Sequence, residues 1–247
     1  MTELLIDYVR LSRTPWYSLI FILPLVALYE ALAVMVNWAS PLQLRNGADV
    51  LLRQLLELFG LSTPYVLGAV FAAGAGVTWF WQRRRYGTTR VVVGYLAGML
   101  FESVVWAVFL LLALYVADQF LMIGATDTVL RTAFLAVGAG IYEEGVFRLI
   151  LITALVSFFQ GAMDWQRPIA QGVAIGLAAV LFALFHYVGV AGEAFAWNSF
   201  GYRSVAGVIL GLLFMLRGFG ITVYAHTIYD LLVLGLQTIQ LDASGMA

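Results

Sequence analysis

The sequence predicts an all-α polytopic membrane protein, a bundle of about seven transmembrane helices with one further amphipathic helix at the interface. Of its 247 residues, 63% are hydrophobic and only 11% are charged, and the mean hydropathy is +0.94. Soluble domains are roughly half apolar and one-quarter charged, so this composition belongs to the membrane class. The third observation is a series of long apolar segments, because a helix needs about 20 mostly apolar residues to cross a bilayer.

Seven segments meet that requirement or come close to it. They are residues 16–38, 65–82, 91–117, 129–158, 169–188, 204–217 and 219–240. The sixth is short, and a break at Arg217-Gly218 separates it from the seventh. No repeat, low-complexity tract or domain boundary divides the chain, so we expect a single integral-membrane domain over residues 1–247.

An amphipathic helix is expected between the first two spans. The stretch NGADVLLRQLLELFG, residues 46–60, carries apolar residues at helical spacing. Asn46 is a residue type that caps helix N-termini. The pattern therefore predicts a helix that follows Asn46 and lies along the membrane interface.

The distribution of arginine predicts the orientation. With the N-terminus inside, the inner side holds Arg10, Arg13, Arg83, Arg84, Arg85, Arg90, Arg167 and Arg217. The outer side then holds Arg45, Arg53, Arg131 and Arg203. Because positive charge is enriched on the cytoplasmic side, we expect a cytoplasmic N-terminus and an external C-terminus, in the inner (cell) membrane of a bacterium.

Composition also excludes several classes of function. The chain has no cysteine, which excludes disulfides, thiol nucleophiles and thiolate metal ligands. Its net charge of −1, without a basic aromatic face, argues against a nucleic-acid partner. The expected partners are the lipid bilayer and a membrane-associated substrate, and no pattern in the sequence indicates the oligomeric state.

Ionisable side chains inside the expected spans are the candidates for function, because each is costly to insert into a membrane. They are Glu30, Glu102, Glu143, Glu144, Arg148, His186, His226 and Asp230. Both histidines of the chain are among them. Glu30 and Glu102 stand apart from the others and are interpreted as structural or interfacial.

The remaining acidic pair divides into two roles by helical spacing. Glu144 and Arg148 are four residues apart, with the acid on the N-terminal side, so they can form an ion pair on one helix face. Glu143 projects about 100° away around the helix. We therefore expect Glu144 and Arg148 to give structural support and Glu143 to be the unmatched carboxylate.

The same spacing recurs on two later helices. Phe182 and His186 are four residues apart, and so are His226 and Asp230. Phe182 is interpreted as packing beneath His186. Three helices thus each present a polar stripe, and we expect the stripes to meet around one wet pocket.

Two kinds of chemistry suit such a set, and both hydrolyse a bond with water. A carboxylate and a histidine can activate water, while a second histidine, supported by a carboxylate, donates to the developing oxyanion. Alternatively, two histidines and a carboxylate are a ligand set for catalytic zinc, with Glu143, His186 and His226 as the candidate ligands.

These residues resemble the motifs of the CPBP family, the CAAX prenyl protease and bacteriocin-processing intramembrane endopeptidases formerly called Abi. The motifs EExxxR, FxxxH and HxxxD/N stand here as Glu143 to Arg148, Phe182 to His186 and His226 to Asp230. The resemblance implies an intramembrane endopeptidase with a catalytic core at about 129–240. It also implies that Glu143 and His186 activate water and that His226 and Asp230 form or support the oxyanion site.

The resemblance leaves the metal and the substrate open. The last motif has Asp230 where prenyl-protein processing members often have asparagine, and an ionised aspartate cannot donate to an oxyanion. Asp230 must then be protonated, orient His226, or bind a metal. The substrate is expected to be a membrane-associated protein or peptide, prenylated or not.

Two other functions are compatible with the polar residues. Buried acids and histidines also mark the ion pathways of ion- or proton-coupled transporters. A non-catalytic immunity or scaffold protein can carry the same sequence features. Both alternatives lack a distinguishing motif here.

The depths of the three motifs predict an irregular bundle. If every span is ideal, His186 lies near the outer end of its helix and His226 nearer the inner end of its own. We therefore expect tilted, broken or extended helices, which glycines such as Gly218 and Gly220 permit.

Overall fold

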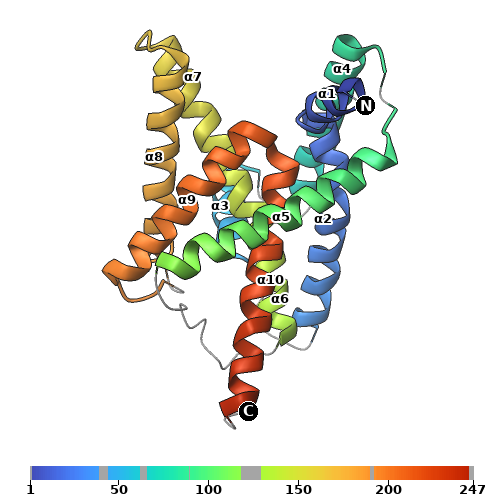
Figure 1. The fold of residues 1–247 in the computed structure, drawn as a ribbon. Helices are drawn as coiled ribbons and strands as arrows, with labels where there is room; N and C mark the ends of the chain where they lie inside the picture. The colour runs from blue at the N-terminus through green and yellow to red at the C-terminus, as the bar shows by residue number, and fades with distance from the viewer. Residues whose placement is uncertain are drawn as a thin grey trace.

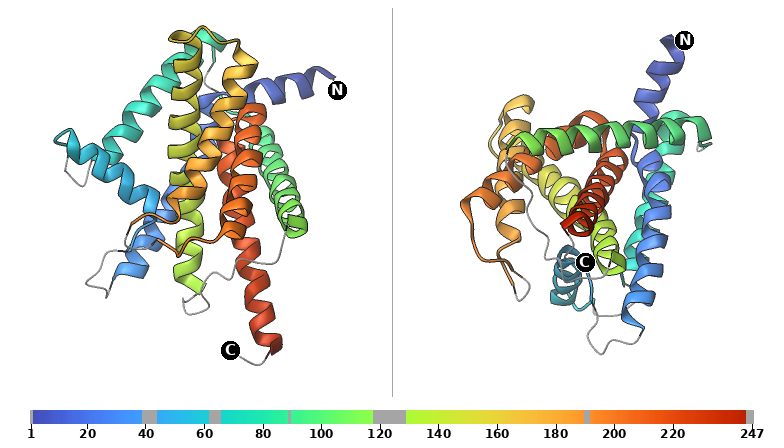
Figure 2. Two further views of the ribbon diagram at one scale, coloured as in Figure 1. Left: turned by 90° about the vertical axis from the view of Figure 1, so that its left-hand side faces the viewer. Right: turned by 60° about the horizontal axis from the view of Figure 1, so that its bottom comes forward.

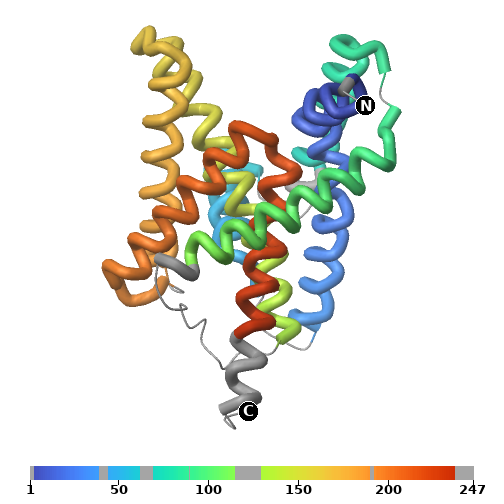
Figure 3. Tube along the Cα trace, in the orientation of Figure 1, coloured from blue at the N-terminus to red at the C-terminus, as the bar shows by residue number. Residues whose placement is uncertain are grey.

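The computed structural model describes residues 2–38, 44–61, 66–88, 90–117, 129–189 and 192–244. These residues form helices joined by short connections, with no strand among them (Figure 1). The path of the chain can be followed in Figure 3. The all-α prediction is therefore confirmed.

The helices follow the expected order, with one addition. The N-terminal half contains α1 (Thr2–Ser12), α2 (Pro15–Asn37), α3 (Gly47–Leu58), α4 (Val66–Tyr86) and α5 (Val93–Ala117). The C-terminal half contains α6 (Val129–Gly138), η1 (Ala139–Ile152), α7 (Thr153–Gly161), α8 (Arg167–Phe185), α9 (Trp197–Arg217) and α10 (Phe219–Ser244). Helix α1 was not expected, because its mixed polar and apolar residues do not make a span.

Five ranges in the described part of the chain are long and apolar enough to cross a membrane. They are Pro15–Asn37, Val93–Leu114, Arg167–Phe185, Trp197–Arg217 and Phe219–Leu236. The expected limit of 204 for the sixth span was wrong, since α9 begins at Trp197 and is 21 residues long. The break after it is confirmed, because Gly218 adopts a φ of +83° that residues with a Cβ rarely adopt.

The fourth expected span is one continuous helical rod of three parts, α6, η1 and α7. Its central part, η1, is a π-helix of 14 residues, in which hydrogen bonds run from residue i to i+5. Such wide turns are uncommon and are often found at functional sites. This segment holds Glu143, Glu144 and Arg148.

Helix α10 occupies the centre of the bundle. It packs against α2, α5, α6, η1 and α9, and Figure 2 shows it surrounded by them. Large apolar side chains cover the outside instead: Phe101 on α5 is 72% exposed. An apolar exterior is expected where lipid is the solvent.

Close contact between η1 and α10 depends on Gly140. A Cβ at this position would lie 1.9 Å from Thr227 Oγ1 and 2.8 Å from the Val223 carbonyl oxygen, both on α10. Small residues let membrane helices approach closely in this way. Gly140 thus allows η1 to carry its acidic residues up to α10.

The points at which the helices begin and end place the three motifs at a similar depth in the bundle. In Figure 1 the connection between α9 and α10 lies below the tops of α7 and α8, so α10 starts partway down the bundle. His226 lies two turns into α10, and His186 caps the lower end of α8. The expected mismatch in depth is therefore removed by the low start of α10.

Gly140→Val should destabilise the protein, because the added side chain forces η1 and α10 apart. Overpacking of this kind costs about 1–3 kcal/mol. We expect a lower Tm in detergent, measured by thermal unfolding, and reduced activity. Gly145→Ala is the matched control, since no atom lies within 4 Å of a Cβ at Gly145. An unchanged Tm for Gly140→Val would show that this contact does not restrict the packing.

Candidate active site

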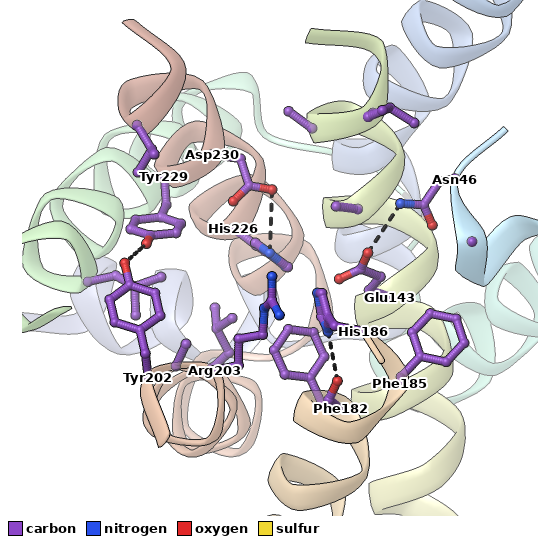
Figure 4. A pocket seen from close by; sticks show the side chains of 18 of the residues that line it. Asn46, Glu143, Phe182, Phe185, His186, Tyr202, Arg203, His226, Tyr229 and Asp230 are labelled. Carbon is purple, nitrogen blue, oxygen red and sulfur yellow. Dashed lines mark hydrogen bonds and ion pairs between the residues drawn. The ribbon is translucent and has the colours of Figure 1, made fainter. Parts of the chain in front are cut away.

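A cavity of about 430 Å³ lies where η1, α8, α9 and α10 face the start of α3. Glu143, His186, His226 and Asp230 all line it (Figure 4). Glu144 is not among the lining residues and is fully buried. The structure therefore brings together the four side chains that the sequence selected for chemistry, and it separates the two neighbouring glutamates.

Glu143 is held by a residue far away in the sequence. Asn46 Nδ2 donates to Glu143 Oε1 at 3.2 Å, and Glu143 is only 8% exposed. Asn46 also caps α3, because its Oδ1 accepts from the Ala48 backbone N–H at 2.8 Å. The cap was predicted, but the contact with Glu143 was not. A helix lying flat at the interface was expected, whereas the N-terminal end of α3 reaches into the site.

A buried ionic cluster fixes the start of α3. Asp49 is fully buried and forms ion pairs with Arg45 at 3.0 Å and Arg53 at 2.7 Å. Tyr29 on α2 donates its hydroxyl to Asp49 at 3.1 Å and accepts the Asn46 backbone N–H at 3.2 Å. Because both contacts of Tyr29 lie within the first turn of α3, they set the position from which Asn46 reaches Glu143.

His186 is oriented by its own helix. Its Nδ1 lies 2.9 Å from the carbonyl oxygen of Phe182. A carbonyl only accepts, so Nδ1 carries the hydrogen of this bond and Nε2 is left for other contacts. The Phe182 ring also packs edge-on against the imidazole, with centroids 5.0 Å apart. Phe182 therefore orients His186 through both its backbone and its ring.

His226 lies between two carboxylates. Its Nδ1 is 2.7 Å from Glu144 Oε1, and its Nε2 is 3.6 Å from Asp230 Oδ2. The first distance is a hydrogen bond, and the second is too long for one. Glu144 is thus the hydrogen-bond partner of the His226 ring, and Asp230 lies close to its other nitrogen.

The expected pairing of Glu144 with Arg148 is present. Their oxygen and nitrogen lie 2.9 Å apart, and both side chains are fully or almost fully buried. Neither Nη1 nor Nη2 of Arg148 has a well-aligned hydrogen bond within the described residues. The guanidinium instead stacks 4.4 Å over the ring of Phe182. Removing one partner of such a pair typically costs about 3–5 kcal/mol, because the other charge stays buried.

The donors expected for zinc do not form a ligand set. Nδ1 and Nε2 of His226 face Glu144 and Asp230, and Nδ1 of His186 donates to a carbonyl. Within the part of the chain described, no group of three or more histidine, aspartate or glutamate side chains is placed to hold a metal ion. Contacts of this kind at Nδ1 also orient metal-bound histidines, which leave Nε2 for the metal.

A second polar group, not predicted from the sequence, lies on the cavity wall. Arg203 and Tyr202 from α9 and Tyr229 from α10 line the cavity, and the two tyrosine hydroxyls are hydrogen-bonded to each other. Arg203 forms an ion pair with Glu193 at 2.7 Å. The span was expected to begin at 204, which placed Arg203 outside the membrane. The sequence did contain a signal for this group, because Arg203 directly precedes the apolar segment that was expected to begin at residue 204.

The fold and cavity define a class: a helical membrane protein with acidic side chains and histidines on the wall of one buried cavity. The family model for "Type II CAAX prenyl endopeptidase Rce1-like" matches residues 106–232, just over half of the chain. The chain belongs to this family, and it is therefore an intramembrane protease of the CAAX type. Searches of curated proteins and of solved structures give no match.

Asn46→Ser should lower kcat for peptide cleavage by roughly 10- to 100-fold, because a hydrogen bond to a charged group contributes about 1.5–3 kcal/mol. Serine keeps the helix cap but is too short to reach Glu143. The Tm should therefore stay close to that of the wild type. Asn46→Ala is the comparison variant, since it loses the cap as well and should also lower the Tm. A wild-type kcat for Asn46→Ser would show that the contact with Glu143 is not used.

Proposed function

We propose that the protein is an endopeptidase that hydrolyses a peptide bond of a membrane-associated protein or peptide, with water activated by Glu143 and His186. The observation that carries the proposal is the arrangement of these two side chains, from η1 and α8, on the wall of one buried cavity. The family description names a CAAX prenyl endopeptidase. A farnesylated CAAX peptide and its unprenylated counterpart are therefore the first substrates to test.

In the proposed reaction Glu143 removes a proton from water, and Nε2 of His186 accepts a hydrogen bond from the same water. The water oxygen bonds to the carbonyl carbon, and the π electron pair of the carbonyl moves to its oxygen. When that pair returns, the C–N bond breaks and the nitrogen takes the proton from Glu143. One water is consumed, and one carboxylic acid and one amine are released.

His226 and Asp230 are proposed to support the side of the cavity where the carbonyl oxygen lies. An ionised carboxylate can only accept hydrogen bonds. We therefore assign Asp230 the role of orienting His226 from the Nε2 side, while Glu144 holds Nδ1. Arg148 keeps Glu144 in place, and Phe182 packs between Arg148 and His186.

We also propose that α4 and the continuous rod α6–η1–α7 cross the bilayer, which gives seven spans in a bacterial inner membrane. In Figure 1 the N-terminus, the α4–α5 connection and the α7–α8 connection lie at the same end of the bundle. Arg83, Arg84 and Arg85 lie in the last turn of α4, at this end. Because cytoplasmic ends are rich in arginine, the proposal puts the N-terminus in the cytoplasm.

Glu143→Gln and His186→Ala should each lower the cleavage rate by about 10²–10⁴-fold, the usual contribution of a general base or its partner. The assay uses purified protein in nanodiscs, with products identified by mass spectrometry. Both variants should still insert and elute as folded protein, because neither residue forms a buried ion pair with Arg148.

Two further variants serve as controls. Glu57→Gln, on the exposed side of α3, should leave the rate unchanged. Glu144→Gln should lower the Tm, because it leaves Arg148 buried without its counter-charge. Cleavage by Glu143→Gln at the wild-type rate would show that Glu143 is not the base. A wild-type protein that cleaves neither peptide would favour the non-catalytic alternative.

We propose that the reaction proceeds without a metal held by Glu143, His186 and His226, because no three histidine, aspartate or glutamate side chains of the described residues are grouped as metal ligands. Protein depleted of metal with 1,10-phenanthroline and then dialysed should cleave at the wild-type rate. Elemental analysis of the same sample measures the residual zinc. A rate that falls with the zinc content and returns when Zn²⁺ is added would contradict this proposal.

A further inference from the structure

Most polar side chains on the side of the cavity proposed for the carbonyl oxygen already have partners within the protein. The ring nitrogens of His226 face Glu144 at 2.7 Å and Asp230 at 3.6 Å. Asp230 is an acceptor when it is ionised. The hydroxyls of Tyr202 and Tyr229 are bonded to each other. A developing negative charge next to Asp230 would be repelled unless a cation lies close by.

Arg203 is a cation in the required place. It lies in the second turn of α9, on the wall of the same cavity, and its side chain is only 12% exposed. Figure 4 shows the guanidinium pointing into the middle of the cavity, towards His226 and His186. The Glu143 carboxylate lies on the far side of His186 in the same view.

One terminal nitrogen of the Arg203 guanidinium has a hydrogen-bond partner, and the other has none within the described residues. Its Nη2 donates to Glu193 Oε1 at 2.7 Å, and its guanidinium carbon lies 5.6 Å from the centre of the Tyr187 ring. Its Nη1 is buried and has no hydrogen-bond partner within the described residues. A buried donor without a partner is uncommon in folded proteins. We therefore expect Nη1 to gain a hydrogen-bond partner when the substrate is bound.

We propose that Arg203 is a catalytic residue that donates from Nη1 to the oxygen of the scissile carbonyl and stabilises the oxyanion. This inference rests on the proposed function. As the water oxygen bonds to the carbonyl carbon, the π electron pair moves to the oxygen that faces Arg203. The guanidinium keeps its protons throughout, since arginine stays charged in proteins. When the C=O bond re-forms, the amine leaves as before.

The proposal explains how the reaction tolerates Asp230. A donor amide at this position could serve the oxyanion directly, whereas a carboxylate cannot. Arg203 supplies a donor that a carboxylate at this position cannot. Glu193 holds Nη2 from the loop before α9, which leaves Nη1 as the group that faces the substrate.

The test compares kcat and KM of Arg203→Gln and Arg203→Lys with those of the wild type on one cleaved peptide. Loss of one oxyanion donor typically lowers kcat by about 10²–10³-fold. We expect that loss for Arg203→Gln with little change in KM, and a smaller loss for Arg203→Lys. Arg90→Gln, at an exposed arginine outside the helices, is the matched control and should match the wild type.

Adding Asp230→Asn to Arg203→Gln should recover at least part of the lost kcat, because the amide restores a donor and removes a repelling charge. A structural role for Arg203 would not produce this recovery. Glu193→Gln breaks the same ion pair at its exposed partner. The fold loss in kcat that it causes should be at least ten times smaller than the loss caused by Arg203→Gln. If Arg203→Gln does not fold, the kcat of Arg203→Lys is the measurement that tests the proposal.

Three outcomes would overturn the inference. The first is a wild-type kcat for Arg203→Gln in an enzyme that Glu143→Gln inactivates, which leaves the proposed function intact. The second is a change confined to KM that disappears when the peptide carries a C-terminal amide, which would make Arg203 a binding site for the substrate carboxylate. The third is a wild-type protein without cleavage, which would remove the proposed function as well.

Discussion

The contact of Glu144 with both Arg148 and His226 is the interaction around which the site is arranged. All three side chains are buried, and an isolated charge in such a place costs several kcal/mol. The need to pair them fixes the rotation of η1 about its axis. Because Glu143 is the adjacent residue, turning Glu144 towards α10 turns Glu143 into the cavity. A structural ion pair thus determines which of two identical side chains lines the cavity.

That contact depends on how closely the helices pack. Gly140 allows η1 to approach α10 at Thr227, one turn from the residues that carry the charges. The low start of α10, after the turn at Gly218, then brings His226 to the level where α8 ends. The π-helical turns of η1 and the early end of α8 are irregular features of a membrane helix bundle. They occur where a cavity, rather than lipid, faces the backbone.

The sequence was informative where the signal is local. The apolar segments, the cap at Asn46, the break at Gly218 and the ion pair of Glu144 with Arg148 each depend on neighbours within a few residues. The contacts that complete the site join distant segments: Asn46 is 97 residues from Glu143, and Glu144 is 82 residues from His226. Helical spacing relates residues three or four positions apart, so it cannot predict contacts between segments this distant in the sequence. Arg203 was placed outside the span because the first two turns of α9 contain aromatic and polar residues. These residues lower the hydropathy of that stretch, so the span was expected to begin only at residue 204.

Helix α3 connects the carboxylate of Glu143 to the surroundings of the bundle. Its far end exposes Leu58 and Phe59, at 81% and 80%, while its near end carries the asparagine that donates to Glu143. Apolar groups exposed in this way are solvated by acyl chains. We therefore expect the thickness and lateral pressure of the lipid to act on the exposed end of α3, and through α3 on the contact of Asn46 with Glu143. Turnover in such a protein becomes a property of the membrane as well as of the polypeptide.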